Sequence, residues 1–304
     1  QVSRGLRDTK IESESASVLL PQLKLVGRDK AHAFRKVLQR PYTADGFLNT
    51  VMEDFILSKD SMVQRVSNSF DFREWFELEI SKQTDTSGYG KSVRNLKAAK
   101  HRFESHSTPV ARFLLYLPSF VAVVTRIAET KADDAVGKAA SLFLQTMTAE
   151  QILQLALIAD AMDEGLLLVR TVDDEGVDLA LISSYVHQFM VRIATLFFEN
   201  AKVMETGYTK HVIELMNTGG ISMFIKRSGE AERLAAPNRE TKQRCLDRMQ
   251  CWAKLAFEVL KTEFPHYGIF NAFGSFQLKS LSAGSSDDGE SQAANVERLA
   301  QVFK

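Results

Sequence analysis

Residues 91–118 read KSVRNLKAAKHRFESHSTPVARFLLYLP, and two patterns in this segment govern the interpretation of the chain. In its first half, cations recur at every third position: Lys91, Arg94, Lys97 and Lys100. On a helix this spacing produces one slowly drifting basic stripe. Apolar residues at helical spacing alternate with the stripe: Val93, Leu96, Ala99 and Phe103. We expect these to face a core, residues 105–109 to break the helix, and a long apolar helix to follow.

Length and composition allow a large core and limit the kinds of partner. The chain has 304 residues, 45% of them apolar, which is enough to bury a substantial core that could form two lobes. Lys+Arg and Asp+Glu each number 38, so nucleic-acid binding would need a local patch rather than net charge. Cys245 and Cys251 lie six residues apart on one predicted helix, which disfavours a disulfide and favours a reducing compartment. Because no apolar run approaches the roughly 18 residues of a membrane helix and no secretory signal is visible, we expect a soluble intracellular protein without a membrane partner.

The hydrophobic periodicity predicts a mainly helical protein with one small α/β unit. Residues 23–27 (LKLVG) form the best predicted strand, and Asp29 stands where the cap of the following helix belongs. Further helices are predicted over 47–55, 62–66, 72–80, 110–130, 149–170, 178–200, 209–216 and from Asn238 to before Pro265. Thr148 and Gln151 have the spacing of a capping box. The helix that they start is predicted to bury one face, made of Ile152, Leu155, Ala156, Ala159, Leu166 and Leu167.

Metal and nucleophile chemistry finds little support in the residue pattern. His101 and His106 are five residues apart across the predicted helix break, without a Cys-x-x-Cys or His-Glu-x-x-His motif. Cys245 is predicted to be a buried helix residue. The acidic pairs at 133–134 and 173–174 are interpreted as solvated loop and helix-end charges. There is no Gly-rich phosphate loop and no Ser nucleophile elbow in the sequence. Because the histidines and cysteines lack the spacing of metal ligands, we predict no metal site.

The basic stripe is the strongest indication of a ligand. Most charged helix faces are only solvated, and a single lysine of the stripe, taken alone, would be interpreted as a solvated residue. A second group of cations surrounds the predicted strand–helix unit: Arg28, Lys30, Arg35, Lys36 and Arg40. Clustered cations interleaved with aromatic residues are suited to following a phosphate backbone. The two groups together therefore favour contact with nucleic acid.

Three landmarks resemble the hAT-superfamily DDE transposases and the host proteins derived from them. Residues 25–34 (LVGRDKAHAF) are similar to the strand and helix that carry a Cys-x-x-His motif in that family. His32 matches the histidine, and Asp29 stands in the place of the cysteine. Another landmark, downstream, runs from Leu117-Pro118 to residues 276–278 and resembles the all-helical insertion of the family.

The remaining landmark lies between these two, at the end of the basic stripe. Residues 100–106 (KHRFESH) resemble the Arg-Trp-x-Ser element that precedes the helical insertion, with Arg102 and Ser105 matching and Phe103 replacing the tryptophan. The family's aromatic stacks on an unpaired base, which Phe103 could do more weakly unless it is a core residue. The resemblance and the cation pattern together predict a DNA-contacting set: Arg28, His32, Arg35, Lys36, Lys91, Arg94, Lys97, Lys100, Arg102 and Phe103.

The resemblance also implies an RNase H-like fold in which two aspartates and a glutamate hold Mg²⁺ for DNA strand cleavage and transfer. The first catalytic strand would precede Gln1, and Asp8 is the only nearby candidate for the second aspartate. Glu297-Arg298 lies on a predicted amphipathic helix without the expected Ser-x-x-Ser-Glu-Arg element. An incomplete carboxylate set cannot hold two metal ions, so we expect no catalytic residue and no cofactor in this chain. Mg²⁺ would be needed only if a longer protein supplies the missing strand.

These observations predict a mainly α protein, a large helical bundle with a partial RNase H-like α/β remnant near the N-terminus. The predicted domains are the remnant with the basic stripe (1–105), a helical insertion-like domain (106–279), a disordered linker (280–293) and a C-terminal docking helix (294–304). The leading functional hypothesis is a transposase-derived nuclear protein that contacts DNA without catalytic turnover. A homo-oligomer is a possible assembly of this protein. The alternatives are an α-helical protein–protein interaction scaffold and an active, Mg²⁺-dependent transposase in a longer form.

Overall fold

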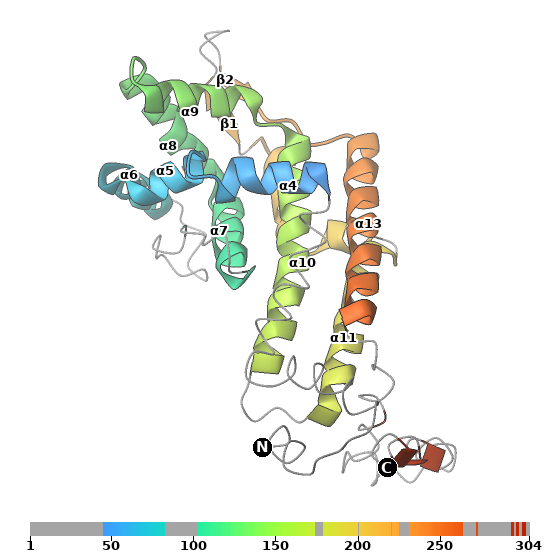
Figure 1. Ribbon diagram of the computed structural model, residues 1–304. Helices are drawn as coiled ribbons and strands as arrows, with labels where there is room; N and C mark the ends of the chain where they lie inside the picture. Colours follow the sequence, from blue (N-terminus) through green and yellow to red (C-terminus); the bar gives the residue numbers. More distant parts are fainter. Residues whose placement is uncertain are drawn as a thin grey trace. The chain divides into compact units, whose positions relative to one another are not determined.

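The computed structural model describes residues 45–82, 103–173, 179–199, 201–219, 221–224 and 231–263, together with Leu96, Ala272 and single positions among 293–301. This part of the chain is mainly helical, as the sequence predicts (Figure 1). The predicted strand at 23–27 and its helix lie outside the described residues, so the α/β remnant stays a prediction. The same holds for the predicted linker at 280–293.

The described residues belong to two compact units. The larger comprises Tyr42–Asp163 and Thr195–Trp252, and the other takes the described residues of Glu164–Ala194 and Ala253–Lys304. The larger unit holds α4 (Gly46–Met52), a π-helical turn (Glu53–Leu57), α5 (Met62–Asn68), α6 (Phe70–Ser81), α7 (Phe103–Leu115), α8 (Leu117–Thr130), α9 (Ala135–Thr146), a 3-10 turn (Lys202–Glu205), α12 (Gly207–Asn217), β1 (Ser222–Phe224) and β2 (Ala231–Arg233). The long helices α10 (Ala149–Asp173), α11 (Leu179–Phe197) and α13 (Arg239–Glu263) contribute residues to both units.

Side-chain caps fix where several helices begin. The predicted capping box at the start of α10 is confirmed: Thr148 N donates to Gln151 Oε1 at 2.9 Å, and Gln151 N donates to Thr148 Oγ1 at 3.3 Å. Asn238 caps α13 as predicted, because its Oδ1 accepts from Thr241 N at 2.8 Å. The starts of α4, α5 and α6 are capped in the same way by Asp45, Ser61 and Ser69. These caps satisfy backbone N–H groups that a helix leaves without an internal partner.

The predicted helix break at residues 105–109 is wrong. Helix α7 runs through Pro109, and the chain bends by 84° only at Tyr116, before Pro118 in the first turn of α8. A proline inside a helix forfeits one backbone hydrogen bond. Here Val110 and Phe113 are fully buried, and their packing offsets that loss. The single helix predicted over 110–130 is therefore two helices, and α9 follows as a helix that the sequence did not predict.

An aromatic cluster forms the core of the larger unit. Its rings meet edge to face, with 5.0 Å between the centroids of Phe113 and Phe120 and 5.7 Å between those of Phe76 and Phe120. Phe55 and Phe143 join the same cluster. The cluster thus ties the π-helical turn, α6, α7, α8 and α9 together.

Helix α10 is buried more completely than its sequence pattern predicts. Every residue from 152 to 162 is buried, so no exposed face exists over three turns. The predicted face is wrong at its end, since Leu166 is only half-buried and Leu167 is 50% exposed, whereas Leu168 and Val169 are buried. A helix that is apolar all round has no periodicity to fix its orientation, which explains the error.

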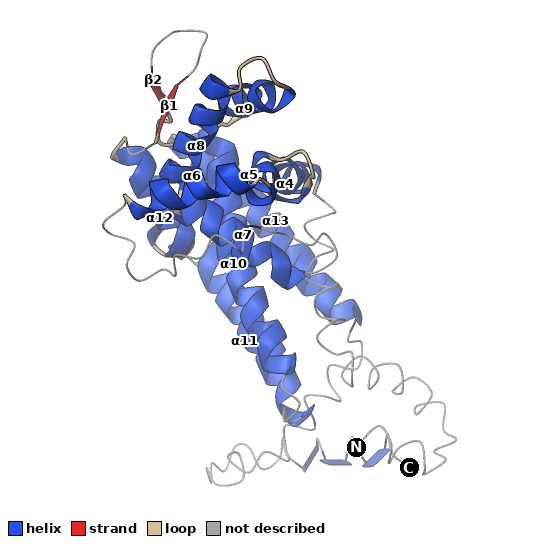
Figure 2. Cartoon of the chain, turned by 90° about the vertical axis from the view of Figure 1, so that its left-hand side faces the viewer, coloured by secondary structure: helices blue, strands red, loops and turns tan. Residues whose placement is uncertain are grey.

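The remaining elements complete the larger unit. Helix α12 matches the helix predicted over 209–216. Strands β1 and β2 pair antiparallel, with Ser222 opposite Arg233, and the sequence did not predict them (Figure 2). In the other unit, Arg192 of α11 pairs with Glu164 of α10. Among the described residues, no single helix is long and apolar enough to cross a membrane, and only the bent pair His106–Leu115 and Leu117–Thr130 passes that test together.

Candidate functional site

Most residues of the predicted DNA-contacting set lie outside the described part of the chain: Arg28, His32, Arg35, Lys36, Lys91, Arg94, Lys97, Lys100 and Arg102, and so does Asp8. Phe103 is the first residue of α7. Between residues 91 and 102 the structure describes Leu96, which is fully buried. The apolar side predicted for this segment is therefore confirmed at Leu96.

Metal and thiol chemistry finds no site in the described ranges. No three His, Cys, Asp or Glu residues of the described set are grouped so that they could hold a metal ion. Both cysteines are free, Cys245 buried as predicted and Cys251 exposed. Burial, with a smaller contribution from the charge of Glu150, raises the pKa of the Cys245 thiol to about 11. Cys245 therefore stays protonated near neutral pH and is a poor nucleophile or ligand.

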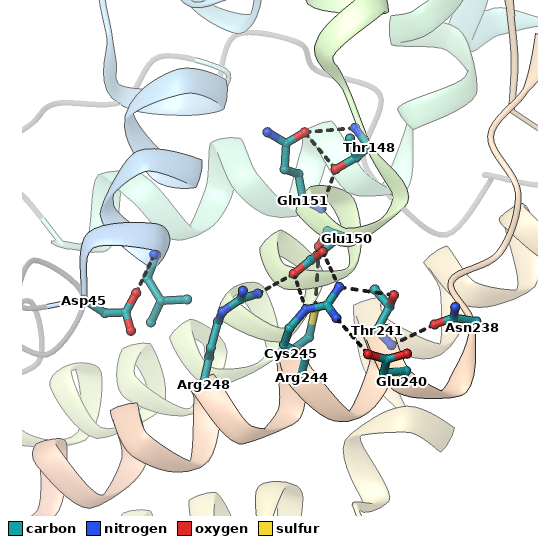
Figure 3. Close-up of polar contacts among 11 residues, drawn as sticks. Asp45, Thr148, Glu150, Gln151, Asn238, Glu240, Thr241, Arg244, Cys245 and Arg248 are labelled. Atoms are coloured by element: carbon teal, nitrogen blue, oxygen red, sulfur yellow. Dashed lines mark hydrogen bonds and ion pairs between the residues drawn. The ribbon is translucent and has the colours of Figure 1, made fainter.

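Glu150 is the centre of an ion-pair cluster between α10 and α13 (Figure 3). Arg244 binds it with both ends of its guanidinium: Nη2 donates to Oε2 at 2.7 Å and Nε to Oε1 at 3.0 Å. Arg248, one turn later on α13, donates from Nη1 to Oε1 at 2.6 Å. The capping box holds Glu150 in the first turn of α10, and the four-residue spacing of the arginines lets both reach it. Two-pronged arginine–carboxylate contacts of this kind are strong and directional.

The cluster is built for holding helices rather than for acid–base chemistry. The hydrogen bond from Arg244, together with the bond and charge of Arg248, lowers the pKa of Glu150 to about 2. Such a carboxylate remains ionised and saturated by its partners, so it cannot exchange protons near neutral pH. Arg248 also lies over the ring of Phe47, with 3.9 Å from its Cζ to the ring centroid, which adds α4 to the cluster. Sequence reasoning missed this cluster because Glu150 and Arg244 are 94 residues apart.

Asp160 is a buried carboxylate that binds the start of α12. Its Oδ1 accepts from Tyr208 N at 2.8 Å and its Oδ2 from Thr209 N at 3.0 Å. These N–H groups belong to the first turn of α12, where a negative charge is favourable. Burial nevertheless outweighs those hydrogen bonds and raises the pKa of Asp160 to about 6. The signal available in the sequence was a lone aspartate within the apolar run 152–162.

His211 and Gln154 are further polar side chains of the larger unit, the first half-buried and the second fully buried. The half-buried ring of His211, on α12, hydrogen-bonds the backbone of Leu115, and partial burial lowers the pKa of His211. Gln154 of α10 is fully buried, and neither atom of its amide has a hydrogen-bond partner among the described residues. Asp160 and His211 thus fasten α12 to α10 and α7. The amide of Gln154 forms no such link to another described residue.

None of these clusters has the form of a catalytic centre within the described part of the chain. Each places its charged groups against each other or against backbone. Comparisons with models of protein families, with curated proteins and with solved structures found no match to this chain.

Proposed function

We propose that this chain is a transposase-derived, largely helical protein that contacts DNA through the basic stripe of residues 91–102. The observation that supports the proposal is the complete burial of Leu96. On an α-helix with Leu96 turned toward a core, Lys91, Arg94 and Lys97 would each lie at least about 100° away from it, whereas Lys100 would lie only about 40° away. Cations held on the outer side of an anchored segment are suited to phosphates, which supply most of the affinity in sequence-independent binding.

The test is DNA binding by the full 304-residue chain, measured by fluorescence anisotropy with duplex and single-stranded oligonucleotides over a range of salt concentrations. Affinity should fall linearly on a plot of log K against log salt. The double variant Arg94→Glu/Lys97→Glu, at two of the outward positions, should bind more weakly, and its salt slope should be smaller by about 2, since each lost phosphate contact contributes a slope of about 0.9.

The matched control is Lys131→Glu/Lys138→Glu, which changes two exposed lysines near α9 and should leave binding unchanged. Binding that ignores both salt and the stripe variant would overturn the proposal. If no oligonucleotide binds and the mass in solution rises with concentration, the interaction-scaffold hypothesis replaces it.

A further inference from the structure

Helix α6 presents an exposed face that combines large apolar and acidic side chains. We call it the α6 face and define it as Phe70, Asp71, Glu74, Glu77 and Leu78. Phe70 is 71% exposed and Leu78 is 52% exposed, although both are large apolar residues. At about 100° per residue the five positions fall within an arc of about 120°, so they form one continuous strip along the helix.

The opposite side of α6 is firmly anchored. Phe76 is 1% exposed and Ile80 4%, and α6 packs against α5 and α8 within the larger unit (Figure 2). The guanidinium of Arg126, on α8, lies 4.0 Å from the ring centroid of Trp75 and adds a cation–π contact between α8 and α6. The core therefore accounts for one side of α6 and leaves the α6 face outside it.

The carboxylates of the α6 face lack partners within the described part of the chain. None of Asp71, Glu74 and Glu77 forms an ion pair with a described residue, and the nearby Lys82 is paired with Glu79 at 2.6 Å. Asp71 lies in the first turn, where a negative charge is favourable. Glu74 and Glu77 lie beyond that turn, and no fold contact among the described residues explains them.

We propose that the α6 face is a docking surface for a basic amphipathic helix of a partner protein. The spacing of Phe70, Glu74 and Leu78, four and eight residues along one row, is the spacing with which a helix meets another helix. Apolar side chains of the partner cover Phe70 and Leu78, and its lysines or arginines pair with Glu74 and Glu77. This inference goes beyond DNA contact and does not depend on it.

The charge of the α6 face selects this occupant over others. Three carboxylates on one strip repel nucleic acid and acidic lipid surfaces, because like charges brought together at an interface cost several kcal/mol. They also disfavour pairing of the α6 face with the same face of a second copy. A cationic, apolar helix is the partner whose charge and shape complement both features.

The probe is a synthetic amphipathic helix of lysine and leucine, titrated against the full chain and followed by anisotropy. The control peptide has the same composition in an order that does not align the leucines on one side. Wild-type protein should bind the amphipathic peptide more tightly than the control peptide. Phe70→Ser/Leu78→Ser should weaken binding about tenfold, because it removes the apolar centre of the contact. Glu74→Gln/Glu77→Gln should weaken binding at low salt and flatten its salt dependence.

Matched protein variants separate the α6 face from general stickiness. Leu142→Ser changes a leucine that is 60% exposed on α9, and Asp133→Asn changes an exposed carboxylate between α8 and α9. Both should bind the probe as wild type does. All the altered residues are exposed, so unchanged circular dichroism and melting should show that the variants are folded.

Three results would overturn the proposal. The first is equal binding by wild type and both α6-face double variants. The second is equal binding of the amphipathic peptide and its control peptide, which would show charge attraction alone. The third is self-association of the wild type that the Phe70→Ser/Leu78→Ser variant abolishes, which would make a second copy the occupant.

Discussion

The carboxylate of Asp160 lies against the backbone of Gly207, where a Cβ atom would come within 2.1 Å of Oδ1. Gly207 has a φ of +59°, a left-handed conformation that side chains disfavour, and it leads directly into the two N–H groups that Asp160 binds. The close approach and the positive φ are therefore two requirements that glycine meets at one position.

Gly207→Ala should lower the free energy of unfolding by at least about 2 kcal/mol. The added methyl group strains the backbone and pushes the buried carboxylate off its hydrogen bonds. Chemical denaturation followed by circular dichroism measures the change. Gly46→Ala is the control, since a Cβ there meets nothing within 4 Å and should change stability by less than about 0.5 kcal/mol. Equal effects of the two substitutions would contradict the contact.

Asp160 should make stability fall as the pH rises from about 4 to 6. Its pKa is raised from 3.8 to about 6 in the folded chain, so the folded state binds this proton more tightly than the unfolded state does. The contribution is on the order of 3 kcal/mol across that window and is constant above it. Denaturation between pH 4 and 7 should show this slope below about pH 6 in wild type and not in Asp160→Asn. Parallel pH profiles of the two proteins would show that the carboxyl is not the titrating group.

Glu150 should act in the opposite direction and at lower pH. Its pKa is lowered from 4.5 to about 2, so its stabilising effect is present above about pH 4.5 and is lost as the pH falls toward 2. At pH 7, Glu150→Gln should cost about 1 kcal/mol, because Arg244 and Arg248 lose their shared partner. Glu240→Gln is the control: its side chain is 86% exposed and 3.8 Å from Arg244, so its effect should be negligible.

The sequence predicted those parts of the fold that depend on neighbouring residues. The capping pair Thr148 and Gln151 and the cap at Asn238 are local chemistry, three residues long, and the structure confirms them. Apolar periodicity likewise located α4 to α6 and α12. The helix break predicted at Pro109 was wrong because the cost of a proline in a helix is local, whereas the burial that offsets it comes from distant segments.

The buried clusters could not be predicted for the same reason. Asp160 contacts α12 across 48 residues and Glu150 contacts Arg244 across 94, and no periodicity relates such positions. A lone aspartate in an apolar run is a signal for a buried acid, but it does not identify the partner of that acid. Of the predicted DNA-contacting segment, the structure tests only Leu96, so the cations themselves stay predictions.

Gln154 gives a last prediction, because it is a polar residue within the buried run 152–162, near the start of α10. Its amide is fully buried without a hydrogen-bond partner among the described residues, which is an unfavourable state for such a group. Gln154→Met has a similar length and no amide to desolvate, so it should raise the free energy of unfolding by about 1 kcal/mol. Thermal and chemical denaturation measure the change.

The control for Gln154→Met is Gln145→Met, at an exposed position of α9 in the same unit, which should change stability by less than about 0.5 kcal/mol. A clear loss of stability in Gln154→Met would contradict the prediction, since it would mean that the amide makes favourable contacts. A double variant, Gln154→Met/Gly207→Ala, would then show whether those contacts depend on Asp160, which lies six residues further along α10. Coupled changes in the free energy of unfolding would place Gln154 and Asp160 in one polar network. Additive changes would show that the two residues act independently.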